Sequence, residues 1–264
     1  MNRLVLPLLL LLAIAAAVAG AWYVLDQGFR NGSAERGGGE VTSEERTLPP
    51  FTRLAVGGAA DITLVQGAAE SVRFETTGRQ KSRVHVEVRD GTLHVDSAPS
   101  GGFLSFFFGG SARPLRATIT FRQLEAVDVS GTVKLRAEGW KAEKLAFSVS
   151  GEATLRIAGL DVTELALSAS GAVKAELAGR ATDQRIAISG AGNYRAADLA
   201  SDNARVAVSG AGKVLLNVAK TLKIAIAGAG SVEYIGDPKV TQDISGVGKV
   251  RRREAAREAS TALA

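Results

Sequence analysis

Apolar residues occupy alternate positions through most of the chain, and the alternation is arranged in similar consecutive copies. Each copy contains a Ser-Gly step, at residues 130–131, 150–151, 170–171, 189–190, 209–210 and 245–246, and Ala227-Gly228 takes the remaining place. Successive glycines are separated by 20, 20, 19, 20, 18 and 18 residues. So regular a period indicates a repeat architecture in which each copy is one unit that stacks on the next.

Alignment of the copies on this glycine gives apolar columns at even offsets. Two residues before it the column reads Val129, Val149, Ala169, Ile188, Val208, Ile226 and Ile244. Four residues before it stand Val127, Phe147, Leu167, Ile186, Val206 and Ile224, and four residues after it Leu135, Leu155, Ala175, Tyr194, Val214, Val232 and Val250. Because side chains alternate between the two faces of a strand, these columns point to one side. The pattern predicts an all-β fold, a parallel β-helix (β-solenoid) with coils of about 20 residues.

Two further columns refine the shape of the coil. The Ser-Gly glycine itself lies at an even offset, which predicts a tight corner without room for an inward side chain. Two residues after it, Val133, Ala153 and Val173 give way to glycines at 192, 212, 230 and 248, which predicts an interior that narrows toward the C-terminus. Nine residues after it stand Trp140, Leu160 and Leu199, which predict a third short side.

Residues 51–98 also alternate but lack the repeat. Residues 61–65 and 72–75 are candidate strands, and Asp90-Gly91 is a strong signal for a two-residue hairpin turn. Such a turn pairs His85 with Asp96 and Glu87 with His94. It also places four apolar side chains on the buried face, namely Val86, Val88, Leu93 and Val95.

The N-terminal segment is an export signal. Arg3 precedes an apolar run over residues 4–25, which predicts either a cleaved signal peptide, with a candidate site at Ala19-Gly20-Ala21, or an uncleaved N-terminal membrane anchor. In an anchor, Trp22 and Tyr23 would lie at the membrane interface. Both alternatives predict an exported protein, in the periplasm or at the cell surface. Residues 26–49, polar and rich in glycine, are predicted to be a flexible linker, and residues 251–264 a charged C-terminal tail.

The composition narrows the classes of function. Cysteine is absent, which excludes disulfides, thiolate metal sites, a cysteine nucleophile and lipoprotein acylation. The repeated serines have no histidine beyond residue 94 to activate them, and the two histidines stand beside carboxylates on exposed strand faces. No metal-ligand or cofactor-binding pattern occurs, because the Gly-x-Gly pairs lie inside predicted strands. The sequence therefore predicts a protein that is not an enzyme and has no cofactor.

The net charge is +5, and cations form one column on the polar face. Three residues after the glycine, lysine alternates with a neutral residue, at Lys134, Lys174, Lys213 and Lys249. In a stack with rungs ~4.8 Å apart, the alternation doubles the spacing between like charges. This basic stripe is a candidate surface for an acidic envelope glycan or for lipid headgroups, and the alternative is an ordinary solvated face.

Two apolar or small-residue features are further candidates for contact with a partner. A glycine-framed cluster includes Phe106, Phe107 and Phe108, which either contact a membrane or partner or cover an open end of the helix. The outward column three residues before the glycine is mostly small, and the flat face it predicts suits a second copy of the chain or a planar sugar chain. No nucleic-acid motif accompanies either feature.

Several copies, residues 206–214 and 224–232 above all, together with residues 236–248 and the segment 51–64, are similar to the auto-transporter adhesin head domain, the GIN domain. The resemblance covers residues 51–250, although this chain lacks the lipoprotein cysteine of many relatives. It implies a right-handed parallel β-helix in an exported protein, implies adhesion, and transfers no catalytic residues.

The leading hypothesis is an exported cell-envelope β-helix that acts as a binding or adhesin-like module without catalysis. One rival is a polysaccharide lyase or hydrolase built on a β-helix, which requires carboxylates and basic residues clustered in one groove. The other is a structural spacer of the envelope that associates with itself through the flat face.

Overall fold

The computed structural model describes residues 41–77, 84–97 and 114–254, all of which belong to the second of two units, residues 40–264. These residues form seventeen β-strands and no helix. Consequently, no helix in this part of the chain is long and apolar enough to cross a membrane. The predicted signal or anchor, residues 1–25, lies outside the described residues, as do residues 98–113 with Phe106, Phe107 and Phe108.

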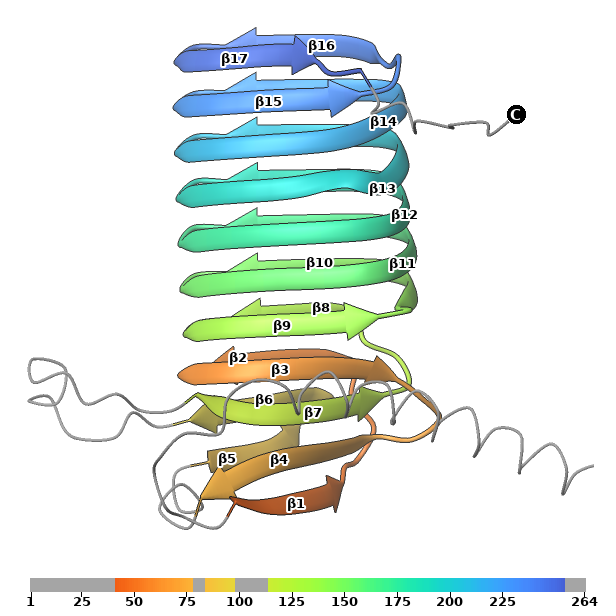
Figure 1. The fold of residues 1–264 in the computed structure, drawn as a ribbon, viewed down its shortest axis with the longest axis vertical. Coiled ribbons are helices and arrows are strands. Elements are labelled where there is room, and N and C mark those ends of the chain that lie inside the picture. Colours follow the sequence, from red (N-terminus) through yellow and green to blue (C-terminus); the bar gives the residue numbers. More distant parts are fainter. Residues whose placement is uncertain (1–40, 78–83, 98–113, 255–264) are drawn as a thin grey trace, which may run out of the picture. The chain divides into compact units, whose positions relative to one another are not determined.

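The repeats form a parallel stack, as predicted. The strands concerned are β8 (Ala126–Val129), β9 (Thr132–Glu138), β10 (Lys141–Val149), β11 (Glu152–Ala169), β12 (Ala172–Ile188), β13 (Ala191–Val208), β14 (Ala211–Ile226), β15 (Ala229–Ile235), β16 (Lys239–Ile244) and β17 (Val247–Arg252). Equivalent residues of successive copies are direct neighbours, such as Glu152 with Thr132 below and Ala172 above. Each copy is therefore one coil of a right-handed β-helix, and all Ser-Gly corners lie along one edge (Figure 1).

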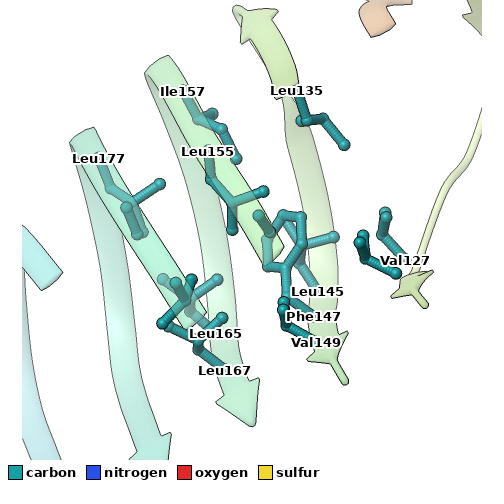
Figure 2. Packing of buried hydrophobic residues seen from close by; sticks show 14 of the residues in the cluster. Val127, Leu135, Leu145, Phe147, Val149, Leu155, Ile157, Leu165, Leu167 and Leu177 are labelled. Carbon is teal, nitrogen blue, oxygen red and sulfur yellow. The ribbon is translucent and has the colours of Figure 1, made fainter. Parts of the chain in front are cut away.

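Each coil has two long sides that enclose the core. The residues after each Ser-Gly corner form the front sheet, which includes β9, β15, β17 and the first parts of β11–β14 (Figure 1). The residues before each corner form the back sheet, which includes β8, β10, β16 and the last parts of β11–β14. Leu155 of the front sheet and Leu167 of the back sheet belong to one buried cluster (Figure 2). The even columns therefore point inward from both sheets, and the odd columns point away from each other.

The predicted core is confirmed up to the last coil. The third apolar position is also buried, with Trp140, Leu160 and Leu199 each at most 1% exposed. The indole of Trp140 packs on Phe121 and Phe147 with ring centroids 5.1 Å and 5.9 Å apart. Near the end of the stack burial fades, because β17 is the last strand among the described residues. Ile244 is 37% exposed there and Val247 82%.

The close approach of successive coils explains the corner glycines. A Cβ on Gly151, Gly171, Gly190 or Gly210 would lie 1.9–2.2 Å from the carbonyl oxygen of the corner glycine one coil below. A side chain is therefore excluded by backbone. The serine hydroxyls satisfy backbone groups, because those of Ser150 and Ser189 donate to the carbonyls of Val129 and Ala169 at 3.3 Å.

The second glycine column compensates for larger neighbours. A Cβ on Gly192 would lie 2.8 Å from Ile188 Cδ1, and one on Gly212 would lie 3.0 Å from Val208 Cγ1. Space freed by glycine is thus taken by β-branched side chains from the other side of the corner. What the sequence predicted as a narrowing of the interior is a transfer of side-chain volume from one side of the corner to the other.

The N-terminal strands do not stack in chain order. They are β2 (Arg53–Gly57), β3 (Ala59–Gln66), β4 (Ser71–Thr77), β5 (Val84–Arg89), β6 (Thr92–Ser97) and β7 (Leu115–Phe121). The coil made by β2 and β3 lies between the coil of β8 and β9 and the coil of β6 and β7, and all these pairs are parallel. Strand β4 pairs antiparallel with β7, and β5 with β6.

The predicted hairpin is confirmed residue by residue. Strand β5 pairs with β6 through His85–Asp96 and Glu87–His94, around Asp90 and Gly91 with φ angles of 51° and 71°. Positive φ at both central residues is what a type I′ turn requires, and Asp-Gly tolerates it. Leu93 and Val95 are buried, while Val86 and Val88 are half-buried against the core.

The boundaries predicted for the linker and for the C-terminal tail both differ from those in the structure. Residues 41–47 are not linker but strand β1 (Val41–Thr47), which pairs antiparallel with β4. Backbone pairing and surface contacts hold this strand, so its side chains need no apolar alternation. One such contact is the hydrogen bond from Arg73 Nη2 to Glu45 Oε2 at 2.7 Å. At the other end, Arg251 and Arg252 belong to β17, so the charged tail begins after them.

Candidate functional site

The predicted lysine column follows one line up the front sheet. Each lysine is separated from the next by one neutral rung: Lys134, Thr154, Lys174, Asn193, Lys213, Ser231 and Lys249 are successive register partners. Lysines therefore recur every second rung, about 9.6 Å apart for rungs of ~4.8 Å.

Three of these lysines border one groove, here named the lysine groove, with a volume of 710 Å³. It is lined by Lys174, Lys213 and Lys249, by Asn193 and Ser231 between them, and by Thr154 and the carboxylate Glu152 at the lower end. A row of small side chains includes Ala172, Ala191, Ala211 and Ala229. The alanines lie one residue after each corner glycine and are exposed. The groove exists because this small column separates the lysines from the corner. Lys134 is not part of it.

The positive charge of the lysine groove is compensated at its lower end, at Lys174. Lys174 Nζ lies 3.4 Å from Glu176 Oε1, and Arg156 Nε lies 3.1 Å from Glu176 Oε2. Partial burial acts to raise the pKa of Glu176, but the charges and hydrogen bonds of Lys174 and Arg156 outweigh it and hold the pKa below its ordinary value. Within the described ranges, no carboxylate forms an ion pair with Lys213 or Lys249. The upper half of the groove is thus its free cationic part.

The family model described as "Putative auto-transporter adhesin, head GIN domain" matches residues 50–238. The chain belongs to this family. Among proteins with curated descriptions, none matches this GIN-domain protein. The resemblance carried by the Ser-Gly repeats is therefore confirmed, and the match also includes the N-terminal strands that lack the repeat.

Solved structures share the fold of this GIN domain. A "putative adhesin" from Bacteroides fragilis is 21% identical, with a TM-score of 0.73, and the match covers 81% of this chain and 97% of that one. A "putative adhesin" from Parabacteroides merdae is 18% identical, with a TM-score of 0.59 and coverage of 82% and 98%. A "putative lipid binding protein" from Parabacteroides distasonis is 16% identical, with a TM-score of 0.62 and coverage of 82% and 98%.

The phenylalanine cluster belongs to the segment between β6 and β7 of this GIN domain. Strand β6 ends at Ser97, and β7 begins at Leu115. Val95 aligns with Val56 and Val56 with Val129, whereas Leu115 aligns with Ala60 and Ala60 with Val133. Asp96 and Ser97 of β6 therefore take the places that Ser130 and Gly131 have in the aligned coil, and residues 98–113 lie outside the described residues. Phe106, Phe107 and Phe108 themselves remain a prediction.

A second groove, on the back sheet, was missed by sequence reasoning. It has a volume of 360 Å³ and is lined by His94, Asp96 and Asp128 together with serines that include Ser130, Ser150 and Ser170. These residues come from β6, β8 and later corners, and β2 lies between them. No local motif signals the groove, because the insertion of β2 and β3 into the stack creates it.

The lysine groove exposes cations beside small side chains. No group of three or more His, Asp and Glu side chains is placed to hold a metal ion in the described segments. The side chain of His85 is 66% exposed, with Nε2 3.3 Å from Glu87 Oε2. Lysine side chains above a shallow floor offer three donors each and full positive charge, which suits an anionic ligand.

Proposed function

We propose that this GIN domain is a non-catalytic, adhesin-like binding module of the cell envelope whose lysine groove binds a linear anionic glycan. The observation that carries the proposal is the straight row of Lys174, Lys213 and Lys249 beside a floor of alanines. A row parallel to the stack axis suits an extended polymer that presents its charges at intervals. The family and its solved relatives, described in part as adhesins, support the class of function.

A glycan is favoured over a lipid surface. A membrane-binding face inserts large apolar or aromatic side chains, and the described residues expose only Val65, Ile244 and Val247 among large apolar ones. Val247 lines only the upper end of the lysine groove, beside Lys249, and neither Val65 nor Ile244 lines it. The solved relative described as a lipid-binding protein makes lipid headgroups the main alternative, and the test below separates the two.

The location follows from the sequence as part of the same proposal. Residues 1–25 act as a cleaved signal or as an N-terminal anchor, and residues 26–40 separate them from β1. The domain then works in the periplasm or at the cell surface, where acidic glycans are available. The intact mass of the mature protein distinguishes the two fates of the segment.

The test compares two triple variants with equal loss of charge. K174S/K213S/K249S removes the groove cations, and K141S/K144S/K220S removes three exposed lysines elsewhere. Binding to polygalacturonate is measured by calorimetry, with neutral dextran as a control polymer. The groove variant raises the Kd about tenfold, since three exposed ion pairs contribute about 0.5 kcal/mol each, while the control variant binds as the wild type.

Three results would overturn the proposal. The groove variant binds polygalacturonate as tightly as the control variant, or the wild type binds anionic phosphatidylglycerol vesicles but no polygalacturonate. The third result is the appearance of new reducing ends or unsaturated products during incubation, which would make the domain a hydrolase or lyase.

A further inference from the structure

A second set of cations lies on the back sheet, in the column five residues before the corner glycine. Arg185 is the direct register partner of Arg205, and Arg205 of Lys223. All three side chains are exposed. We name this set the cation ladder. Its members lie on consecutive rungs, ~4.8 Å apart, half the spacing of the lysines on the front sheet.

The ladder differs from the other adjacent cations Arg136 and Arg156, which are register partners but pair with Asp61 and Glu176. Like charges directly opposite one another on neighbouring strands destabilise a sheet. In the lysine column neutral residues intervene, and Arg156 has Glu176 as its neighbour one rung above. Among the described residues, no carboxylate forms an ion pair with a ladder cation. Asp183, two residues before Arg185, instead accepts a hydrogen bond from Asn203 Nδ2 at 3.0 Å.

The surface next to the ladder is flat and open. Outward columns there carry small residues: Ala146 and Ala166 below Arg185, and Ser148, Ser168, Ala187 and Ala207 beside it. Arg185 and Arg205 border a shallow groove of 230 Å³ with several of these residues. The guanidinium groups therefore stand beside a surface on which a chain of sugar rings can lie without obstruction. An arginine binds a carboxylate through two parallel hydrogen bonds.

We propose that the cation ladder is a second glycan site, which binds a polyuronate chain along the stack axis, and that one GIN domain bridges two such chains. The ladder runs parallel to the stack axis, so a polyuronate chain that lies along it can present carboxylates to more than one of its cations. The bridging part rests on the proposed function of the lysine groove. The ladder site stands on its own geometry.

Bridging follows from the position of the two cation sets. The columns four residues before and four residues after each corner glycine, such as Phe147 and Leu155, are both buried in one core (Figure 2). The odd columns of the front and back sheets consequently face in opposite directions. A short straight chain bound to the lysine groove cannot reach the ladder, so each sheet holds its own chain.

The first test counts binding sites. The ladder variant R185S/R205S/K223S and the groove variant K174S/K213S/K249S are each titrated with a short oligogalacturonate by calorimetry, next to K141S/K144S/K220S. All substituted side chains are exposed, and thermal melting verifies that each variant folds. We expect two bound oligosaccharides per protein for the wild type and the control. For the ladder variant and the groove variant, here called the single-face variants, we expect one oligosaccharide bound with the wild-type Kd and the second with a Kd about tenfold higher.

The second test measures bridging with long polygalacturonate, by turbidity and by the size of complexes in light scattering. The wild type and the control variant form large complexes, whereas both single-face variants bind polymer without linking it. Loss of turbidity only in the groove variant would overturn the inference and leave the proposed function intact. Two sites with the wild-type Kd in the ladder variant would do the same. If only the ladder variant lost binding, the proposed function would fail and the ladder site would stand.

Discussion

The front and back sheets are built from the same coils but treat positive charge differently. On the front sheet, Lys174 and Lys213 are separated by the neutral Asn193, and Lys174 also has Glu176 as a partner. On the back sheet, Arg185 and Arg205 lie on neighbouring rungs, and neither has a carboxylate partner among the described residues. Neutral residues and Glu176 weaken the repulsion between cations on the front sheet, whereas the ladder cations lie on consecutive rungs. This difference is the reason why we propose an anionic ligand for the ladder.

Both columns depend on the register that the corner glycines allow, and a corner substitution has the largest expected effect. In G210A the new Cβ lies 2.0 Å from the Gly190 carbonyl oxygen, so backbone has to move. We expect a loss of about 3 kcal/mol in the free energy of unfolding, measured by urea denaturation. Both glycan sites would weaken together.

The matched control for G210A lies two residues away in the same coil. In G212A the new Cβ lies 3.0 Å from Val208 Cγ1, the end of a side chain, and a small adjustment accommodates it. The change stays within about 1 kcal/mol, helped by the lower entropy of the unfolded chain. Equal losses in the two variants would show that the corner does not require glycine.

The next effect concerns the buried hydrogen bond between Tyr194 and Gln184, which joins the two sheets. The buried Tyr194 hydroxyl, on the front sheet, donates to Gln184 Oε1 of the back sheet at 2.8 Å. Gln184 Nε2 has no hydrogen-bond partner among the described residues. Y194F leaves the whole amide unsatisfied and costs about 1–3 kcal/mol, whereas the double variant Y194F/Q184L recovers much of the loss in thermal unfolding.

Alkaline titration examines the same hydrogen bond. Burial raises the pKa of Tyr194 above its ordinary value, since the anion would be desolvated in the core. The neutral phenol is therefore favoured in the folded state, and its contribution to stability is complete below pH ~10 and declines as the pH rises further. Y194F loses less stability than the wild type between neutral and alkaline pH. An identical pH dependence would contradict this assignment.

A smaller effect compares the two cation sets directly. R205S removes the middle charge of the ladder and relieves two like-charge contacts, so it raises the free energy of unfolding by about 0.5 kcal/mol at low salt. The gain fades at high salt because the charges are exposed and screened. K213S, between two neutral rungs, leaves stability unchanged. A loss of stability in R205S would show that the ladder is structural.

The smallest effect is expected for E176Q, which leaves cations of the front sheet without an acidic partner, like those of the back sheet. E176Q leaves Lys174 and Arg156 without their acidic partner and adds free positive charge beside the lysine groove. We expect a two- to threefold lower Kd for polygalacturonate, about 0.5 kcal/mol. Because the pKa of Glu176 is held low, the carboxylate stabilises the fold above the ordinary pKa of glutamate, ~4.3, and this contribution is lost as the pH falls further. In E176Q the free energy of unfolding therefore falls less than in the wild type as the pH drops below ~4.3.

The repeat made much of this structure predictable. Even offsets from the Ser-Gly step identified core residues such as Leu155 and Tyr194, and Asp90-Gly91 fixed the register of a hairpin. Strand β1 escaped detection, because its polar side chains contribute no alternation and antiparallel backbone pairing with β4 holds it. The place of β2 and β3 between later coils was also hidden, since it depends on long-range pairing rather than on local pattern.

The candidate sites were predictable only in part. The lysine column follows from one odd offset, but the groove beside it depends on the alanine column and on the register of six coils. The ladder was visible in the sequence as Arg185, Arg205 and Lys223 at a constant offset. It was overlooked because the odd column there begins with alanines. The groove with Asp96 and Asp128 required the three-dimensional arrangement of β2, β6 and β8.

The most direct test of the two-sided account is an NMR titration of side-chain nitrogen and carbon signals with trigalacturonate. The account predicts two sets of shifted signals with independent saturation, one from Lys213 and Lys249 on the front sheet and one from Arg185, Arg205 and Lys223 on the back sheet. Shifts confined to a single sheet, or centred on the groove with Asp96 and Asp128, would contradict it.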